Sequence, residues 1–249
     1  MVSAAFALAA CDAQQPAQTP RGETVSVSAA EYLSPPAPQT IEGRGDGLVL
    51  AGTAPAGSKV RLATPRGQAL LADADGKGRW RIALGPSPQP RVFGLSVAVT
   101  GRQAQAQGYV LAEPGGRAAL LRAGAAALRL DRPAPPGLRS LDYDREGGAV
   151  ISASVTAGAT VLLRVDGAQV AQGRAGADGR AELALPTPLR PGAHRLQIYA
   201  DGVSDAVAVQ VSPPQPLADG PLRSQLTSAG LRVDWMTPGG GIQSTLLIH

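Results

Sequence analysis

The side chains best able to do chemistry are few in this sequence. One cysteine, Cys11, and two histidines, His194 and His249, supply all of its thiol and imidazole groups. Zinc, haem and iron–sulfur sites need clusters of such groups, so the sequence predicts no metal centre and no cofactor. A serine hydrolase would also need a nucleophile on a strained G-x-S-x-G turn, which the sequence lacks. His194 follows a Pro-Gly-Ala turn and is predicted to be a solvated loop residue, so no catalytic residue is assigned.

Residues 73–78, with the sequence DADGKG, come nearest to a metal-binding loop. A calcium loop takes oxygen ligands from alternate positions and ends in a closing acidic residue. No acidic residue follows within reach in the sequence. We therefore interpret Asp75-Gly76 as a β-turn, selected for its backbone geometry, and predict no metal site.

Cys11 ends an apolar run of small residues, since the chain opens MVSAAFALAAC. The segment LAAC resembles the lipobox of bacterial lipoproteins, in which small side chains precede the cleaved bond and the thiol carries diacylglycerol. The resemblance implies a signal peptide over residues 1–10 and lipidation of Cys11, with the membrane as a partner through that anchor. Residues 11–37 are polar and contain proline, which is typical of a flexible tether.

The start of the chain departs from a signal peptide in one respect. Such a peptide begins with a positively charged region, and no Lys or Arg precedes Arg21. We therefore expect the true start to lie upstream of Met1. The alternative is a cytosolic protein with an alanine-rich start and a chance cysteine. Asp12 resembles the inner-membrane retention signal of enterobacterial lipoproteins, and so favours the inner membrane.

Composition excludes several classes of protein. The chain has 249 residues and a net charge of +4, and only 17% of its residues are charged. The small, scattered basic excess gives no argument for nucleic acid. Recurring apolar segments exclude disorder throughout, and the most apolar run, residues 2–10, is too short to span a bilayer. Aromatics are 3% of the chain. This composition favours a structural or binding module over an enzyme.

Residues 49–84 and 150–185 align as two copies of one unit, with Val60 matching Val161 at an offset of 101. A period of this size indicates a duplicated domain. In RWRIAL, which begins at residue 79, Trp80 and Leu84 share one face with the isoleucine between them, while the two arginines lie opposite. Short strands separated by Gly-rich turns predict a β-sandwich of immunoglobulin-like size.

The two copies share a pattern of a small residue, Pro or Ala, Gly, Ser or Ala, then V-x-L, and later Asp-Gly and Leu, and the first copy adds Trp80 after its Asp-Gly. This pattern resembles the bacterial Ig-like domains of envelope and adhesin proteins. The second copy is similar to modules found beside LysM domains, although the sequence holds no LysM module and has Ala181 where the first copy has Trp80. The resemblance implies the fold and leaves the function open.

We therefore predict an all-β chain with two tandem immunoglobulin-like β-sandwich domains, a β-meander between them and a C-terminal hairpin. The predicted segments are a signal peptide (1–10), a tether (11–37), Ig-like domain 1 (38–112), the meander (113–136), Ig-like domain 2 (137–212), and a Pro-rich linker with the hairpin (213–249). A short helix over residues 118–130 is the alternative to the meander. The hairpin pairs residues 231–236 with 242–248.

The hairpin contains more apolar residues than a one-faced strand needs. A lone two-stranded hairpin is marginal in water, so it must pack on something. It either caps the second domain or docks a partner protein through Trp235, Leu246, Leu247 and Ile248, and the Pro-rich linker favours docking.

The function predicted from these features is that of a non-enzymatic, lipid-anchored cell-envelope protein that faces the periplasm and docks an envelope protein. Open sheet edges could pair with a partner strand. The alternative is a module that binds peptidoglycan or another glycan. Arginine outnumbers lysine 21 to 2, and it suits carboxylate and phosphate recognition. We attribute this ratio to coding bias.

Overall fold

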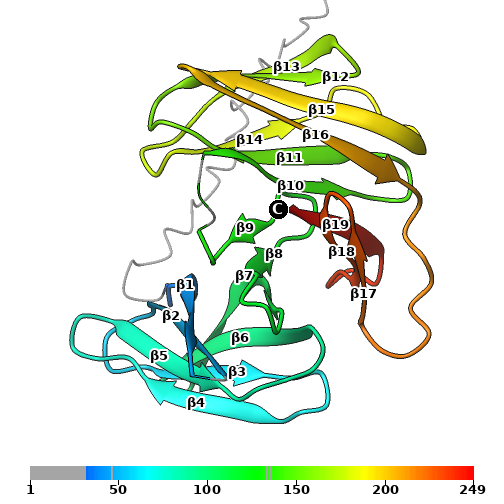
Figure 1. Cartoon of the computed structure of the whole chain (residues 1–249). Helices are drawn as coiled ribbons and strands as arrows, with labels where there is room; N and C mark the ends of the chain where they lie inside the picture. Colours follow the sequence, from blue (N-terminus) through cyan, green and yellow to red (C-terminus); the bar gives the residue numbers. More distant parts are fainter. Residues whose placement is uncertain (1–31, 46, 133, 135) are drawn as a thin grey trace, which may run out of the picture. The chain divides into compact units, whose positions relative to one another are not determined.

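The computed structural model describes residues 32–45, 47–132, 134 and 136–249 (Figure 1). Within these residues the chain forms strands, turns and bends and contains no helix. The described part accordingly holds no helix long and apolar enough to cross a membrane. From Leu33 to His249 the chain is one compact unit.

The first copy of the repeat folds as a sandwich of two antiparallel sheets, here called the first sandwich. Its strands are β1 (Ala37–Arg44), β2 (Gly47–Thr53), β3 (Lys59–Ala63), β4 (Ala69–Asp73), β5 (Arg79–Leu84), β6 (Arg91–Val99) and β7 (Arg102–Ala112). One sheet has the order β1-β2-β5, and the other begins β4-β3-β6-β7. Apolar side chains from both sheets fill the space between them.

The second copy, the second sandwich, repeats this topology. Its strands are β10 (Gly137–Tyr143), β11 (Ala149–Ser154), β12 (Thr160–Val165), β13 (Ala168–Arg174), β14 (Arg180–Ala184), β15 (Gly192–Ala200) and β16 (Val203–Val211). The orders β14-β11-β10 and β13-β12-β15-β16 match those of the first sandwich strand for strand. The predicted fold of two tandem immunoglobulin-like β-sandwiches is confirmed.

The connection between the sandwiches is a meander. After β7 the chain turns back twice through β8 (Ala118–Leu121) and β9 (Leu128–Arg129), and each strand pairs antiparallel with the one before it. The alternative of a helix over residues 118–130 is therefore wrong. The meander extends the second sheet of the first sandwich to six strands.

The tail forms β17 (Leu222–Thr227), β18 (Gly230–Met236) and β19 (Ile242–Ile248). The predicted hairpin is confirmed as β18 and β19, whereas β17 lies in the stretch predicted as linker. Strand β19 also pairs with β10, so one six-stranded sheet runs β14-β11-β10-β19-β18-β17 (Figure 1).

The run of three apolar residues in β19 is explained by burial of both faces of the strand. Leu246 and Ile248 pack into the core of the second sandwich. Leu247 points the other way, because successive side chains of a strand alternate. It packs with Trp235 in a bridging cluster, which joins the tail to the meander. The other residues of the bridging cluster are Leu111, Ala119, Leu121, Ala127, Leu231 and Val233.

The first sandwich is built around Trp80. Its side chain is buried with those of Ile82 and Leu84, as the alternation in the sequence predicted. Gly52 lies opposite Trp80 on β2, and a Cβ at Gly52 would stand 2.6 Å from the indole and 2.2 Å from the carbonyl oxygen of Ala37. The indole therefore requires glycine at that position.

Candidate functional site

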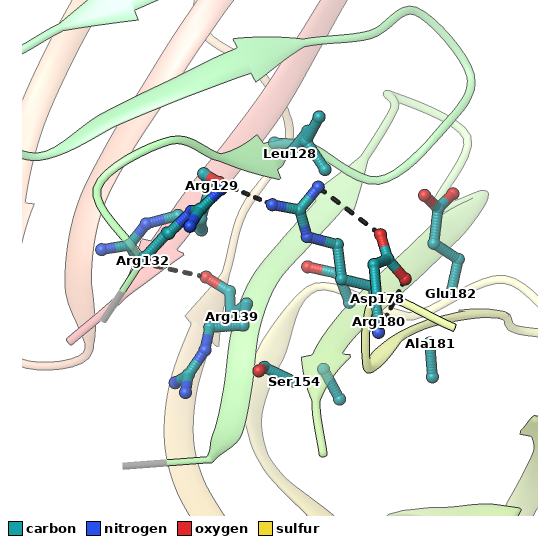
Figure 2. Close-up of a pocket in the computed structure, with 12 residues that line it drawn as sticks. Leu128, Arg129, Arg132, Arg139, Ser154, Asp178, Arg180, Ala181 and Glu182 are labelled. Carbon is teal, nitrogen blue, oxygen red and sulfur yellow. Dashed lines mark hydrogen bonds and ion pairs between the residues drawn. The ribbon is translucent and has the colours of Figure 1, made fainter. Parts of the chain in front are cut away.

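A cleft of about 320 Å³ lies where the end of the meander meets strands β10, β11 and β14 of the second sandwich. Four of the residues that line it are apolar: Ala127, Leu128, Ala153 and Ala181. The polar lining comprises four arginines, two serines and two acids: Arg129, Arg132, Arg139, Arg180, Ser152, Ser154, Asp178 and Glu182 (Figure 2). This arginine cleft is the candidate functional site.

Arg129, at the end of β9, is held by its own partners. Its Nε and Nη2 donate to the two carboxylate oxygens of Asp131 at 2.8 and 2.7 Å. Its Nη1 donates to the carbonyl oxygen of Ile248 at 2.5 Å. A bidentate pair of this kind fixes the guanidinium, so Arg129 ties the meander to the last strand.

Arg139 occupies a β-bulge. Leu138 pairs with Ala153 and Ser140 with Ser152, which leaves Arg139 as the extra residue of β10. The arginine is buried, with 7% of its surface exposed, and its Nη1 donates to the carbonyl oxygen of Leu138 at 3.0 Å. Burial, followed by the nearby charge of Arg129, lowers the pKa of Arg139. The bulge thus holds a positive charge in a place where water is scarce.

Arg180 and Arg132 complete the positive lining. Figure 2 shows the Arg180 guanidinium directed at Arg129 and Asp178; its Nη2 donates to the Arg129 carbonyl at 3.4 Å, and its Nη1 lies 3.8 Å from Asp178 Oδ2. Arg132 is exposed and has a φ of 44°, in the left-handed region. No contact of the described chain engages its guanidinium. Arg132 therefore brings to the cleft a charge that forms no ion pair with the described residues.

A buried carboxylate, Asp142 on β10, joins the meander to the tail. It accepts hydrogen bonds from the Ala127 backbone at 2.8 Å and from the hydroxyls of Ser140 at 2.7 Å and Thr245 at 2.5 Å. Burial raises the pKa of Asp142 to about 6, against the effect of these hydrogen bonds. Its charged form is therefore tolerated only because several donors face it.

A second, apolar pocket of about 400 Å³ lies between the first sandwich and the tail. Three aromatic residues help to line it: Phe93, Tyr109 and Trp235. The rings of Tyr109 and Trp235 meet edge to face with centroids 6.0 Å apart. Trp235 and Phe93 are buried, so Tyr109 is the most accessible of the three rings.

The predicted functional residues have different outcomes. Cys11 and Asp12 lie outside the described residues, so lipidation stays a prediction. Trp235, Leu246, Leu247 and Ile248 are each at most 5% exposed and fill the chain's own clusters. The docking surface predicted from them is corrected on this ground, because side chains packed inside the chain are not free to contact a partner.

The residues considered for chemistry have structural contacts. Asp75 Oδ1 accepts hydrogen bonds from the backbones of Lys77 and Arg79, which is the predicted turn. His194 was expected in a solvated loop, but it lies in β15 with its side chain 14% exposed, 2.7 Å from Asp166. In the described part of the chain, no three His, Cys, Asp or Glu side chains gather as metal ligands.

Sequence reasoning missed the arginine cleft. Its arginines come from the meander, β10 and the β14 turn, at spacings that match no motif. The excess of arginine over lysine was the only signal, and it could not say which arginines meet. Pairing of β11 with β10 and β14 places Arg139 and Arg180 in one sheet, and hydrogen bonds of Arg129 with the Arg139 carbonyl and with Arg180 bring the end of the meander to them.

Comparison with known proteins gives no family. No family model matches the chain, and no curated protein matches it. Among solved structures it is similar to the BSP domain of a biofilm-associated protein (16% identity, TM-score 0.27), covering 73% of this chain but 30% of that one. It is also similar to a central fibronectin-III array of RIM-binding protein (14% identity, TM-score 0.26), and the match covers 86% of this chain and 89% of that one. A third similar structure is invasin, a bacterial integrin-binding protein (13% identity, TM-score 0.22), and the match covers 87% of this chain and 54% of that one. TM-scores of this size support no assignment of fold or function, so the β-sandwich assignment rests on the strand order described above.

Proposed function

We propose that this chain is a non-enzymatic structural module of the bacterial cell envelope, anchored by lipid at Cys11, which holds a partner protein at a distance from the membrane. The bridging cluster is the observation that carries the proposal. Leu247 and Trp235 of the tail pack against Leu111 of β7 and Leu121 of the meander. Strand β19 of the same tail pairs with β10 of the second sandwich. Because the tail contacts both sandwiches in this way, the two are suited to act together as a spacer.

Two exposed sheet edges support an adaptor role. Strand β17 ends one six-stranded sheet and strand β4 ends the other. Leu226 on β17 is 65% exposed, and Leu71 on β4 is 70% exposed. An edge strand offers unpaired backbone groups to an extended segment of a partner. These edges replace the buried hairpin residues as the proposed docking surface.

Membrane fractionation with metabolic palmitate labelling tests the anchor. Cys11→Ser should abolish the label and move the protein from the membrane to the soluble fraction, because a serine hydroxyl cannot form the thioether. Asp12→Ser is the matched control, since it retains the thiol and should retain label and membrane association. Equal label and equal membrane recovery in Cys11→Ser would refute the anchor.

Glycan binding remains the second candidate function, supported by the pocket that Phe93, Tyr109 and Trp235 help to line. Sugars stack on accessible aromatic faces, and Tyr109 is the ring best placed for this. Titration with soluble peptidoglycan fragments tests it. Binding that Tyr109→Ala abolishes would support this function, while an absence of binding to the folded wild-type chain would exclude it for these fragments.

A further inference from the structure

The arginine cleft is lined by more positive than negative side chains. Four guanidinium groups and two carboxylates line it. The pairs that neighbouring charges form, by ion contact or by electrostatic interaction, are Arg122 with Glu182, Arg129 with Asp131, Arg180 with Asp178, and Arg139 with Asp205. Within the described residues, each of these four arginines has an acidic neighbour, whereas no ion pair involves Arg132.

The backbone of the cleft is shaped to present these charges. Bulges re-aim a side chain and are common beside functional sites. The first sandwich has the same bulge, between Pro38 and Thr40, with Gln39 as the extra residue. The second sandwich has Arg139 there, so a shared distortion of the fold carries a buried cation in this copy alone. Arg132 has a φ of 44°, a backbone conformation that is uncommon for a residue with a Cβ atom.

The rest of the lining sets the size and chemistry of a ligand. Ala127, Leu128, Ala153 and Ala181 supply apolar contact, and the volume of about 320 Å³ suits a small organic group. A guanidinium matches a carboxylate through two parallel hydrogen bonds. Arg132 offers one guanidinium group with no ion-pair partner among the described residues, and this matches the single carboxylate of a ligand that also has an apolar part.

We propose that the arginine cleft binds a small aliphatic monocarboxylate, such as the C-terminal residue of a peptide, with its carboxylate on Arg132 and its apolar part against the alanines. This inference goes beyond the proposed function and does not rest on the lipid anchor. The carboxylate would pair with the Arg132 guanidinium, and the bulged Arg139 and Arg180 would add to the positive potential around it.

Titration of the full chain, followed by amide chemical shifts, tests the site. N-acetyl-alanine should shift the resonances of Leu128, Ala181 and Glu182 in a saturable way, and its affinity should fall as salt is added. N-acetyl-alanine amide, which has the same shape without the charge, should not shift them. Equal responses to the two ligands, or no response to either, would overturn the proposal.

Two variants place the binding on the cleft. Arg132→Gln should weaken N-acetyl-alanine about tenfold or more, because a hydrogen bond to a charged group is lost. Arg132 is exposed, so the variant should fold. Arg66→Gln removes an exposed charge from the β3–β4 turn and should leave the affinity unchanged. An equal loss in both variants would show nonspecific attraction and refute the site.

Two further probes distinguish the source of the charge. Acetate should bind more weakly than N-acetyl-alanine, because it lacks the group that contacts the alanines. Inorganic phosphate should also bind more weakly, since it has no apolar part to contact the alanines. Tighter binding of phosphate than of N-acetyl-alanine would overturn the assignment to a carboxylate. The Cys11→Ser experiment is unaffected by any of these results, so the two proposals fail separately.

Discussion

The two sandwiches share a topology but differ in what covers the outer face of their three-stranded sheets. In the first sandwich, Glu42 on β1 has a side chain that is 66% exposed and lies 3.8 Å from Arg81. By strand register, Asp142 on β10 occupies the same position, since Glu42 pairs with Val49 and Asp142 with Val150. The tail and the meander cover Asp142, and every residue of β10 is buried. The same position of the fold thus holds a solvated carboxylate, Glu42, in the first sandwich and a buried hydrogen-bond acceptor, Asp142, in the second.

The inner faces differ as well. Trp80 faces Gly52 in the first sandwich, and the corresponding pair in the second is Ala181 and Ala153. The second sandwich lacks the indole and has recruited Leu246 and Ile248 of the tail into its core. The comparison indicates that the first sandwich depends on its own tryptophan, whereas the second depends on a strand from outside the repeat.

Removal of the tail should have the largest effect. Deletion of residues 218–249 takes β17–β19 away and exposes the buried length of β10. Each large apolar side chain lost from a core costs about 2–5 kcal/mol, so several together exceed the roughly 5–15 kcal/mol that holds a typical domain folded. We expect the second sandwich to unfold in denaturant titration of the truncated chain.

The single substitution Leu226→Ala is the control for this deletion, because Leu226 belongs to the same tail but is exposed. It should change the free energy of unfolding by less than about 0.5 kcal/mol. A truncated chain that unfolds with the wild-type midpoint would show the tail to be separable, and the comparison of the two cores would be wrong.

Loss of Trp80 comes next. Trp80→Ala should lower the free energy of unfolding by about 3–5 kcal/mol, because the indole is 2% exposed and leaves a cavity beside Gly52. Arg81→Ala, on the neighbouring exposed position, should have little effect. Guanidinium denaturation of the full chain measures both. Similar losses in the two variants would show that the indole does not hold the core.

Asp142 should make stability depend on pH. Its carboxyl pKa is about 6 in the folded chain and near 3.9 in an unfolded one, so the folded state holds the proton more tightly between these values. Proton binding at Asp142 therefore stabilises the folded state fully below about pH 4, and this stabilisation, about 3 kcal/mol in total, is lost as the pH rises through 6. The free energy of unfolding should therefore fall over this window.

Asp142→Asn removes the titrating group and should flatten this part of the curve, while Glu42→Gln, at the equivalent exposed site, should leave it unchanged. The quantity to compare is the difference between wild type and variant at each pH, which cancels the other carboxyls. A wild-type slope retained in Asp142→Asn would assign the titration to another group.

Much of the fold could be predicted from the sequence, because period-two alternation and Gly-rich turns are local signals. The alternation around Trp80 and the repeat at an offset of 101 were sufficient for the sandwiches. The position of the tail was not predictable in this way: Leu246, Leu247 and Ile248 showed that it must pack, but not on what. The pairing of β19 with β10 is set by packing on both faces. The arginine cleft depends on contacts between the meander and the β10-β11-β14 strands, which no local pattern in the sequence encodes.

The smallest expected effect concerns His194, whose counterpart in the first sandwich is the buried Phe93 at an offset of 101. The Nδ1 of His194 lies 2.7 Å from the Asp166 carboxylate and its Nε2 lies 2.8 Å from the Arg190 carbonyl. Both neighbours are acceptors, so only the protonated ring can donate to both. Burial works against the charge, but the hydrogen bonds to Asp166 and to the Arg190 carbonyl, together with the charge of Asp166, outweigh it and raise the pKa of His194.

Because this pKa is raised on folding, the imidazolium stabilises the folded chain below the ordinary histidine pKa of about 6.5, and the contribution is lost as the pH rises through the folded value. We expect about 0.5–1 kcal/mol, since the partner Asp166 is half exposed. His194→Gln should remove this step from the pH dependence, and Asp166→Asn should remove it too while the Arg195 backbone retains an acceptor. His194→Phe, which copies the first sandwich, should be pH-independent over the same range. A wild-type free energy of unfolding that does not change between pH 6 and 8 would mean that the His194 ring stays neutral. The contact between His194 and Asp166 would then make no pH-dependent contribution to stability.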